Sequence, residues 1–235
     1  VGELRLEWMW SMHEGDSEPS PLVYNGVVYL INTSNIIQAL DGQTGNLIWE
    51  HNAGPFDSED MRNIAIYNDK IIHATTDARL LALDARTGEK IWEYHTMPAA
   101  DYTGMVSATG VKQRGPSGAP IWTTPTIDAQ RSQIYVTTGE NTSHPTTGTS
   151  DAVIALDLET GEELWVFQAL ANDMWNFGCS AGGPNCIILD DTNSVDFECQ
   201  RPCVFMLLYG CVAPSVHFLQ SGPILCVSYI GFSPS

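Results

Sequence analysis

Apolar residues occur along this chain in short runs separated by turn-forming residues. The runs Pro21–Tyr24 and Val27–Ile31 flank Asn25-Gly26, a dipeptide typical of two-residue β-hairpins. The same arrangement recurs downstream, in the pairs Asn63–Tyr67 with Ile71–Thr75, and Thr124–Ile127 with Gln133–Thr138. No segment before Arg201 has the apolar spacing of a long amphipathic helix. The pattern therefore predicts an all-β protein of short antiparallel strands.

A second pattern, with an aspartate, a threonine, a glycine and a tryptophan at fixed spacing, follows each pair of runs. An aspartate carboxylate can accept hydrogen bonds from the backbone N–H groups of a turn, and a glycine supplies the positive φ that reverses the chain. The pattern therefore predicts a tight hairpin whose tryptophan lies on the outer strand and buries its ring against a neighbouring sheet. With x for any residue, its copies are Ala39-Leu40-Asp41-x-x-Thr44-Gly45-x-x-x-Trp49, Ala82-Leu83-Asp84-x-x-Thr87-Gly88-x-x-x-Trp92 and Ala155-Leu156-Asp157-x-x-Thr160-Gly161-x-x-x-Trp165.

The spacing of this motif predicts the fold class. Asp41 and Asp84 are 43 residues apart, the length of one four-stranded blade, and Asp84 and Asp157 are 73 apart, a blade with about 30 inserted residues. We expect a partial β-propeller of four-stranded antiparallel blades over residues 1–186. Because a closed ring needs about four to eight blades, we expect the chain alone to be poorly stable and inactive, or to need further chain.

The inserted residues indicate where binding takes place. If the strands of a blade are lettered A to D, B–C loops and D–A links share one end of the blades, since successive strands alternate in direction. The insertions at residues 96–121 and 139–150 are a D–A link and a B–C loop, and the segment 172–186 follows a D strand. We therefore expect all three to gather at one end, where binding residues are usually found.

Residues 187–235 contain no copy of the motif. We leave this segment unassigned and expect it to be aberrant or disordered. The apolar part of it is interrupted by proline and polar residues, so we expect no membrane span. All six cysteines lie after residue 178, and a disulfide between Cys179 and Cys186 would indicate a periplasmic or secreted protein.

The charge excludes one class of partner. The net charge is −18, from 28 acidic and 10 basic residues, and it would repel a phosphate backbone. We expect no nucleic-acid partner. Acidic side chains also suit oxygen-seeking cations such as calcium.

The repeated motif resembles the blade signature of the pyrroloquinoline quinone (PQQ) dehydrogenases. The run from Gly115 to Asp128, with Thr138-Gly139-Glu140-Asn141 and Ser150-Asp151-Ala152-Val153, is most similar to the polyvinyl alcohol dehydrogenase branch of that family. The resemblance covers about residues 8–186. It implies PQQ and calcium as cofactors, an alcohol as substrate and an electron acceptor such as a cytochrome c.

The resemblance also implies roles for particular residues. Trp122 resembles the tryptophan beneath the quinone, with core packing as the alternative. Glu140 and Asn141 resemble the metal-binding region, with a polar loop as the alternative, and Asn141 also counts among the quinone-binding positions. Arg62 resembles an arginine that pairs with the quinone oxygens. Glu18 resembles a cofactor-contacting glutamate, with a solvated surface residue as the alternative.

Two departures from the family pattern concern the chemistry. The family's adjacent cysteines are replaced by Phe56-Asp57. The segment Asp173-Met174-Trp175-Asn176 resembles one that ends in the catalytic aspartate, but Asn176 is an amide and cannot accept a proton as a carboxylate does. Asp173 is the substitute base, with a loop cap as the alternative.

Two functions follow from these residues. The first is oxidation of an alcohol, either secondary or polymeric, by hydride transfer to the quinone, with calcium as Lewis acid. The second is a non-catalytic propeller that binds other proteins, because fold alone does not decide function.

Overall fold

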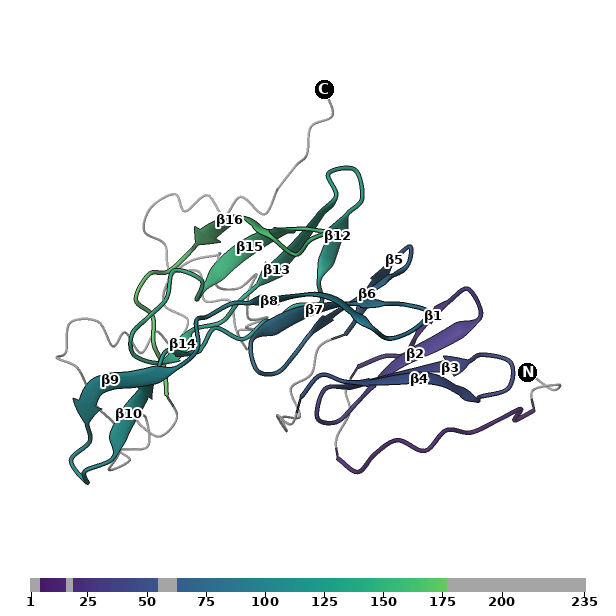
Figure 1. Cartoon of the computed structure of the whole chain (residues 1–235), viewed down its shortest axis with the longest axis horizontal. Coiled ribbons are helices and arrows are strands. Elements are labelled where there is room, and N and C mark those ends of the chain that lie inside the picture. Colours follow the sequence, from purple (N-terminus) through teal and green to yellow (C-terminus); the bar gives the residue numbers. More distant parts are fainter. Residues whose placement is uncertain (1–4, 16–18, 55–62, 177–235) are drawn as a thin grey trace, which may run out of the picture. The chain divides into compact units, whose positions relative to one another are not determined.

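The computed structural model describes residues 5–15, 19–54 and 63–176 (Figure 1). The chain divides into two units, Val1–Val195 and Asp196–Ser235, and the second lies wholly outside the described residues. The predicted domain boundary after residue 186 also lies outside them and stays a prediction. The described part contains strands and no helix, so the predicted all-β class is confirmed.

Three four-stranded antiparallel sheets form the blades, each paired in the order A-B-C-D. The hairpins predicted around the A–B turns and around the repeated motif are present in all three. The first blade is β1 (Leu22–Tyr24), β2 (Val27–Asn32), β3 (Ile36–Asp41) and β4 (Leu47–Asn52). The second is β5 (Ala65–Tyr67), β6 (Lys70–Ala74), β7 (Arg79–Asp84) and β8 (Lys90–His95). The third is β12 (Thr126–Asp128), β13 (Gln133–Thr137), β15 (Ala152–Asp157) and β16 (Glu163–Gln168).

The hairpin of the repeated motif closes as its chemistry predicts. In the first blade the Asp41 carboxylate accepts hydrogen bonds from the amides of Gln43 (3.0 Å) and Thr44 (2.7 Å). These bonds stabilise the charged carboxylate and lower the pKa of Asp41, the amide of Thr44 having the largest effect. Gly45 then takes a φ of 74°. The second and third blades repeat the two amide bonds at Asp84 and Asp157.

Apolar side chains from alternate positions of each central strand pack between the blades. In the second blade, Ile71 and Leu81 face a cluster shared with the first blade, whereas Ile72 and Leu80 face a cluster shared with the third. This is why the residues 80–83 of β7 are all apolar rather than alternating with polar ones. The blades are therefore held together by side chains on both faces of their inner strands.

The tryptophan of the motif joins each blade to the next. Trp49 and Trp92 are each only 8 % exposed, and their indole N–H groups donate to Ala85 O (3.0 Å) and Leu158 O (3.2 Å) of the following blade. Trp165 is 43 % exposed and packs against Tyr135 of its own blade, with ring centroids 5.9 Å apart. The predicted packing of these rings between blades is confirmed for the first two copies.

The long link after the second blade has structure of its own. It contains the hairpin of β9 (Asp101–Val106) and β10 (Lys112–Gly115), drawn in teal in Figure 1. The sequence analysis placed this insertion but did not predict its strands. Among the described residues, no helix is long and apolar enough to cross a membrane.

Candidate functional site

The two insertions pair with each other beside the third blade. β11 (Ser117–Gly118) lies antiparallel to β14 (Asn141–Ser143), and Gly118 is the partner of Asn141. Next to this pair, the amide of Ala119 donates to Glu140 O at 2.7 Å. The expectation that the D–A link and the B–C loop meet at one end of the blades, called here the loop end, is confirmed.

Gly118 allows the insertions to approach this closely. Its φ is +99°, and a Cβ built there would lie 2.4 Å from the amide nitrogen of Thr142. Any side chain would therefore clash with backbone and would also be strained at this φ. The pairing that positions Glu140 and Asn141 depends on glycine at this position.

The segment after the third blade joins the same cluster. Asn141 forms a parallel bridge with Met174, and the amide of Trp175 donates to Asn141 O at 2.9 Å. The side chain of Asn176 donates from Nδ2 to Thr142 O at 3.0 Å. The structure therefore places Glu140, Asn141, Asp173 and Asn176 on adjoining segments, which the sequence separates by some thirty residues.

Asn141 has a structural role at the centre of this cluster. Its side chain is fully buried, Oδ1 accepts a 2.8 Å bond from the amide of Thr147, and Nδ2 donates to Ser117 O at 3.3 Å. The amide thereby holds the B–C loop against the inserted strand β11. The Thr147 hydroxyl also lies 3.4 Å from Oδ1, so a cation at this oxygen would compete with that hydroxyl for its second lone pair.

Two carboxylates interact in the site. Asp173 is buried, with 8 % of the residue exposed, and burial raises the pKa of its carboxyl, with a further increase from the negative charge of Glu140. The backbone N–H of Met174 offsets part of this increase in the pKa of Asp173. A group that binds protons more tightly than an ordinary aspartate therefore lies beside a second carboxylate.

Trp122 comes shortly before β12, the A strand of the third blade, whereas Glu140 and Asn141 follow β13, its B strand. The amide of Trp122 donates to Thr137 O at 3.1 Å, and the preceding Ile121 bridges Thr138. The residue is partly exposed. Because Thr138 leads directly into Glu140, the backbone places Trp122 at the loop end of the third blade.

Other predicted residues fall outside the described part of the chain. These are Glu18, Arg62, the Phe56-Asp57 pair and all six cysteines, including Cys179 and Cys186. Within the described residues, no group of three or more His, Cys, Asp or Glu side chains is arranged to hold a metal ion. The described site thus offers the carboxylates of Glu140 and Asp173 and the side-chain amide oxygens of Asn141 and Asn176.

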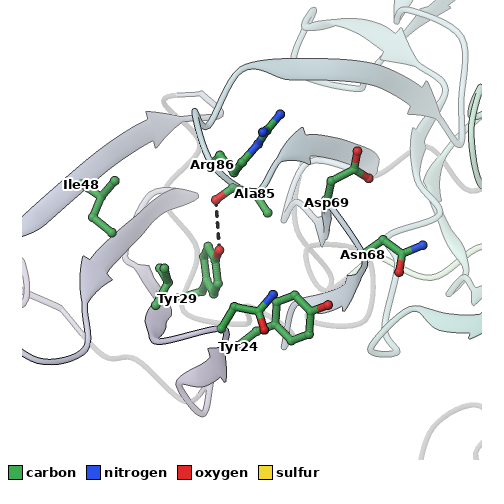
Figure 2. A pocket seen from close by; sticks show the side chains of 9 residues that line it. Tyr24, Tyr29, Ile48, Asn68, Asp69, Ala85 and Arg86 are labelled. Carbon is green, nitrogen blue, oxygen red and sulfur yellow. Dashed lines mark hydrogen bonds between the residues drawn. The ribbon is translucent and has the colours of Figure 1, made fainter.

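A separate pocket lies at the opposite end of the blades, called here the turn end. It has a volume of about 810 Å³ and lies between the A–B and C–D turns of the first two blades. Figure 2 shows Tyr24, Tyr29 and Ile48 of the first blade facing Asn68, Asp69, Ala85 and Arg86 of the second, with the Tyr29 hydroxyl bonded to Ala85 O (3.0 Å). This pocket is not part of the loop-end site.

The sequence analysis missed the residues that support the site. Ser117 and Thr147 hold Asn141, and Gln168 donates from Nε2 to Thr147 O at 2.8 Å. A lone serine, threonine or glutamine carries no recognisable pattern, so no signal in the sequence would have found them.

Comparison with known families identifies the family to which this propeller belongs. The PQQ family, described as the glucose/ethanol/alcohol dehydrogenase β-propeller domain, matches residues 67–192, just over half of the chain. The chain belongs to this family. A second family, that of the outer membrane protein assembly factor BamB, matches residues 5–117.

Two curated relatives are similar to part of this chain. A polyvinylalcohol dehydrogenase of Sphingopyxis sp. (strain 113P3) is 40 % identical over 74 residues, 32 % of this chain and 11 % of the relative. A polyvinylalcohol dehydrogenase of Pseudomonas sp. is 39 % identical over 70 residues, 30 % of this chain and 11 % of the relative. The matched part thus spans about a tenth of these relatives.

A solved structure agrees with the PQQ propeller fold. The quinohemoprotein alcohol dehydrogenase ADHIIG of Pseudomonas putida HK5 superposes with a TM-score of 0.51 at 19 % identity, covering 66 % of this chain and 27 % of that one. At this identity the likeness concerns the fold alone.

Proposed function

We propose that this chain forms blades of a PQQ-dependent alcohol dehydrogenase and that the loop end of its third blade is part of the cofactor and substrate site. The observation that carries the proposal is the electrostatic coupling of Glu140 and Asp173, which come from two segments at the loop end of the blade that also carries Trp122. A propeller that served only as a scaffold would have no need to bury a carboxylate next to another.

The donors in this site fit a hard divalent cation, and we propose calcium. Glu140 and Asn141 would hold it through oxygen atoms, which calcium prefers. A cation between Glu140 and Asp173 would also remove the like-charge repulsion that raises the pKa of Asp173. The described residues supply only part of a calcium shell, so ligands from elsewhere would complete it.

Asp173 is the proposed proton acceptor for the hydroxyl group of the alcohol. Its raised pKa makes it a better base than an ordinary aspartate once it is ionised. The indole of Trp122 would offer a flat apolar surface to the quinone ring, and Glu18 and Arg62 would contact its polar edge. Asn176 would position the segment through its bond to Thr142 O rather than move a proton. When bound, PQQ would supply the acceptor for the hydride from the alcohol carbon.

The proposed substrate is a secondary or polymeric alcohol, because two relatives that are 40 % and 39 % identical to parts of this chain are named polyvinylalcohol dehydrogenases. We further propose a cytochrome c or similar protein as electron acceptor and a periplasmic or secreted location.

A second function is favoured by one observation, the match of residues 5–117 to the BamB family. In that case the blades would bind proteins and would need no quinone. The two functions differ in whether PQQ binds, which makes binding the deciding measurement.

The chain, completed by the further blades that the sequence analysis expects, should be titrated with PQQ with and without calcium chloride, following quinone absorbance and the reduction of a dye by added alcohol. Saturable binding that calcium strengthens is expected. Trp122→Ala should weaken binding about tenfold, the equivalent of one lost stacking contact. Trp165→Ala is the matched control, because Trp165 lies on the same blade but outside the site. The absence of saturable binding would favour the protein-binding scaffold.

A further inference from the structure

The pocket at the turn end lies at one of two comparable blade junctions. Its volume of about 810 Å³ falls within the range of small-molecule sites. The turns that line it belong to the first and second blades, as Figure 2 shows. The corresponding turns of the second and third blades also meet, so the two junctions can be compared residue by residue.

Strand register and motif position identify the equivalent residues. Val27 and Lys70 are equivalent, because each begins a B strand and pairs with the motif aspartate of the C strand. Arg86 and Glu159 are also equivalent, because each stands two positions after a motif aspartate. The first junction therefore has a valine and an arginine where the second has a lysine and a glutamate.

An ion pair closes the second junction. Lys70 Nζ lies 2.9 Å from a carboxylate oxygen of Glu159 and 3.0 Å from one of Asp69. The lysine side chain is only 11 % exposed, so its long aliphatic stem fills space between the second blade and the third. At this junction the protein itself supplies both the stem and the matching charge.

The first junction has neither the stem nor the ion pair. Valine is short and uncharged, so Val27 cannot bridge the space to Arg86, and both residues line the pocket. Within the described part of the chain, the carboxylate nearest to Arg86 is that of Asp84, but Nη2 and Oδ2 are 3.8 Å apart, which is longer than a hydrogen bond. The Arg86 side chain is 82 % exposed and therefore keeps N–H donors for another acceptor.

The negative charge in the pocket is already paired. Asp69 lines the pocket, and its carboxylate accepts a 3.0 Å hydrogen bond from Lys70 Nζ. This bond has the largest effect on the pKa of Asp69, which it lowers, whereas Arg86 has the smallest. Asp69 is therefore paired with Lys70 rather than with Arg86, and the charge that the pocket offers to a ligand is that of Arg86.

Much of the remaining wall is apolar. Tyr24 and Ile48 are 36 % and 48 % exposed, so a ligand would cover apolar surface that now faces water. The hydroxyl of Tyr29 is already bonded to Ala85 O at 3.0 Å, which leaves its ring as a wall of the pocket (Figure 2). A cation beside exposed aromatic and aliphatic groups suits a ligand with one anionic end and one apolar end.

We propose that this pocket binds a small organic acid, with its carboxylate on Arg86 and its apolar body against Tyr24 and Ile48. An arginine and a carboxylate can form two parallel hydrogen bonds, which fix the orientation of the acid. The side-chain amides of Asn25 and Asn68, which also line the pocket, offer further donors. The pocket lies at the opposite end of the blades from the proposed quinone site and needs no quinone.

The test uses the chain completed by its further blades, without PQQ, and two ligands of nearly the same shape. Phenylacetate and its uncharged amide, phenylacetamide, are titrated separately and followed by ligand-observed NMR. Phenylacetate should bind saturably with a dissociation constant of about 0.1–1 mM, a range that suits a ligand of about ten heavy atoms. It should bind about fivefold more tightly than the amide, because its hydrogen bonds to Arg86 are charge-assisted.

Variants locate the acid within the pocket. Arg86→Gln should weaken binding of phenylacetate about fivefold and leave that of phenylacetamide unchanged. Arg131→Gln is the matched control, because Arg131 is also an exposed arginine of an A–B or C–D turn but belongs to the third blade and does not line the pocket. The double variant Val27→Lys, Arg86→Glu rebuilds the ion pair of the second junction and should abolish binding of both ligands.

Other outcomes would overturn the proposal. No saturable binding, or equal binding of acid and amide, would mean that the pocket does not recognise an anion. Equal loss in the two single arginine variants would place the acid elsewhere on the surface, as would binding to a double variant that unfolds in urea like the parent. If the double variant does not fold, Arg86→Gln decides. None of these results depends on PQQ, so this site and the proposed function can fail independently.

Discussion

The indole N–H of Trp92 donates to Leu158 O at 3.2 Å, and this bond joins the second blade to the third across 66 residues of sequence. The ring that makes it is 8 % exposed, whereas the ring of Trp165 in the last described blade is 43 % exposed. The tryptophan of the motif therefore contributes differently to the stability of the fold according to whether a following blade covers its ring.

Replacement of these two tryptophans should therefore differ in effect. Trp92→Ala should lower the free energy of unfolding by about 3–5 kcal/mol, the usual loss for a buried tryptophan. Trp165→Ala should lower it by about 0.5–1.5 kcal/mol, because it loses mainly the contact with Tyr135. Urea unfolding of both variants measures the difference. Equal losses would indicate that Trp165 is also covered.

Gly88→Ala tests the close contact of the motif glycine with the tryptophan. A Cβ at Gly88 would lie 2.6 Å from Trp49, and the φ is +73°. Gly26→Ala is the matched control, because Gly26 has a φ of +80° and nothing within 4 Å of its Cβ. Strain alone should cost about 1 kcal/mol at Gly26, and the clash should add about 1–3 kcal/mol at Gly88. Chemical denaturation that gave the same loss at both positions would rule out the clash.

His73 should make the protein sensitive to mild acid. The residue is fully buried, neither ring nitrogen has a hydrogen-bond partner among the described residues, and burial, with a smaller effect of His51, lowers the pKa of His73 to about 3. The unfolded chain takes up this proton near the usual pKa of 6.5, so stability should fall as the pH drops below that value toward 3. The slope should approach about 1.4 kcal/mol per pH unit.

Two variants separate this titration from packing. His73→Leu places the residue found at the equivalent Leu30 of the first blade, and His73→Gln keeps a polar group that does not titrate. Both should remove the slope attributed to His73 from unfolding curves measured between pH 4 and 7, while only the leucine variant should also be more stable at neutral pH. An unchanged slope in both would assign the acid sensitivity to another group.

The coupling of Glu140 to Asp173 can be measured without any cofactor. Glu140→Gln should lower the pKa of Asp173 toward its ordinary value, because the second of its two raising influences is removed. Carboxyl-carbon NMR titration reports this shift. Glu162→Gln, in the exposed turn at the other end of the third blade, is the control and should leave the titration of Asp173 unchanged. A calcium-dependent fall in the same pKa would support a cation between the carboxylates.

The sequence alone predicted the elements that depend on local chemistry. Asp157, Thr160 and Gly161 close a turn through contacts a few residues apart, so three copies of the pattern were enough to place hairpins, blades and the strand parity that brings the insertions to one end. The period of the copies then identified the propeller class.

Only the tertiary structure decided what depends on contacts between distant segments. It buried Asn141 and bonded its side chain to Thr147 and Ser117, and it coupled Asp173 to Glu140. The physical reason is the range of the interactions: a turn is determined by neighbouring residues, whereas burial and the pKa of a carboxyl depend on which remote segments fold against it.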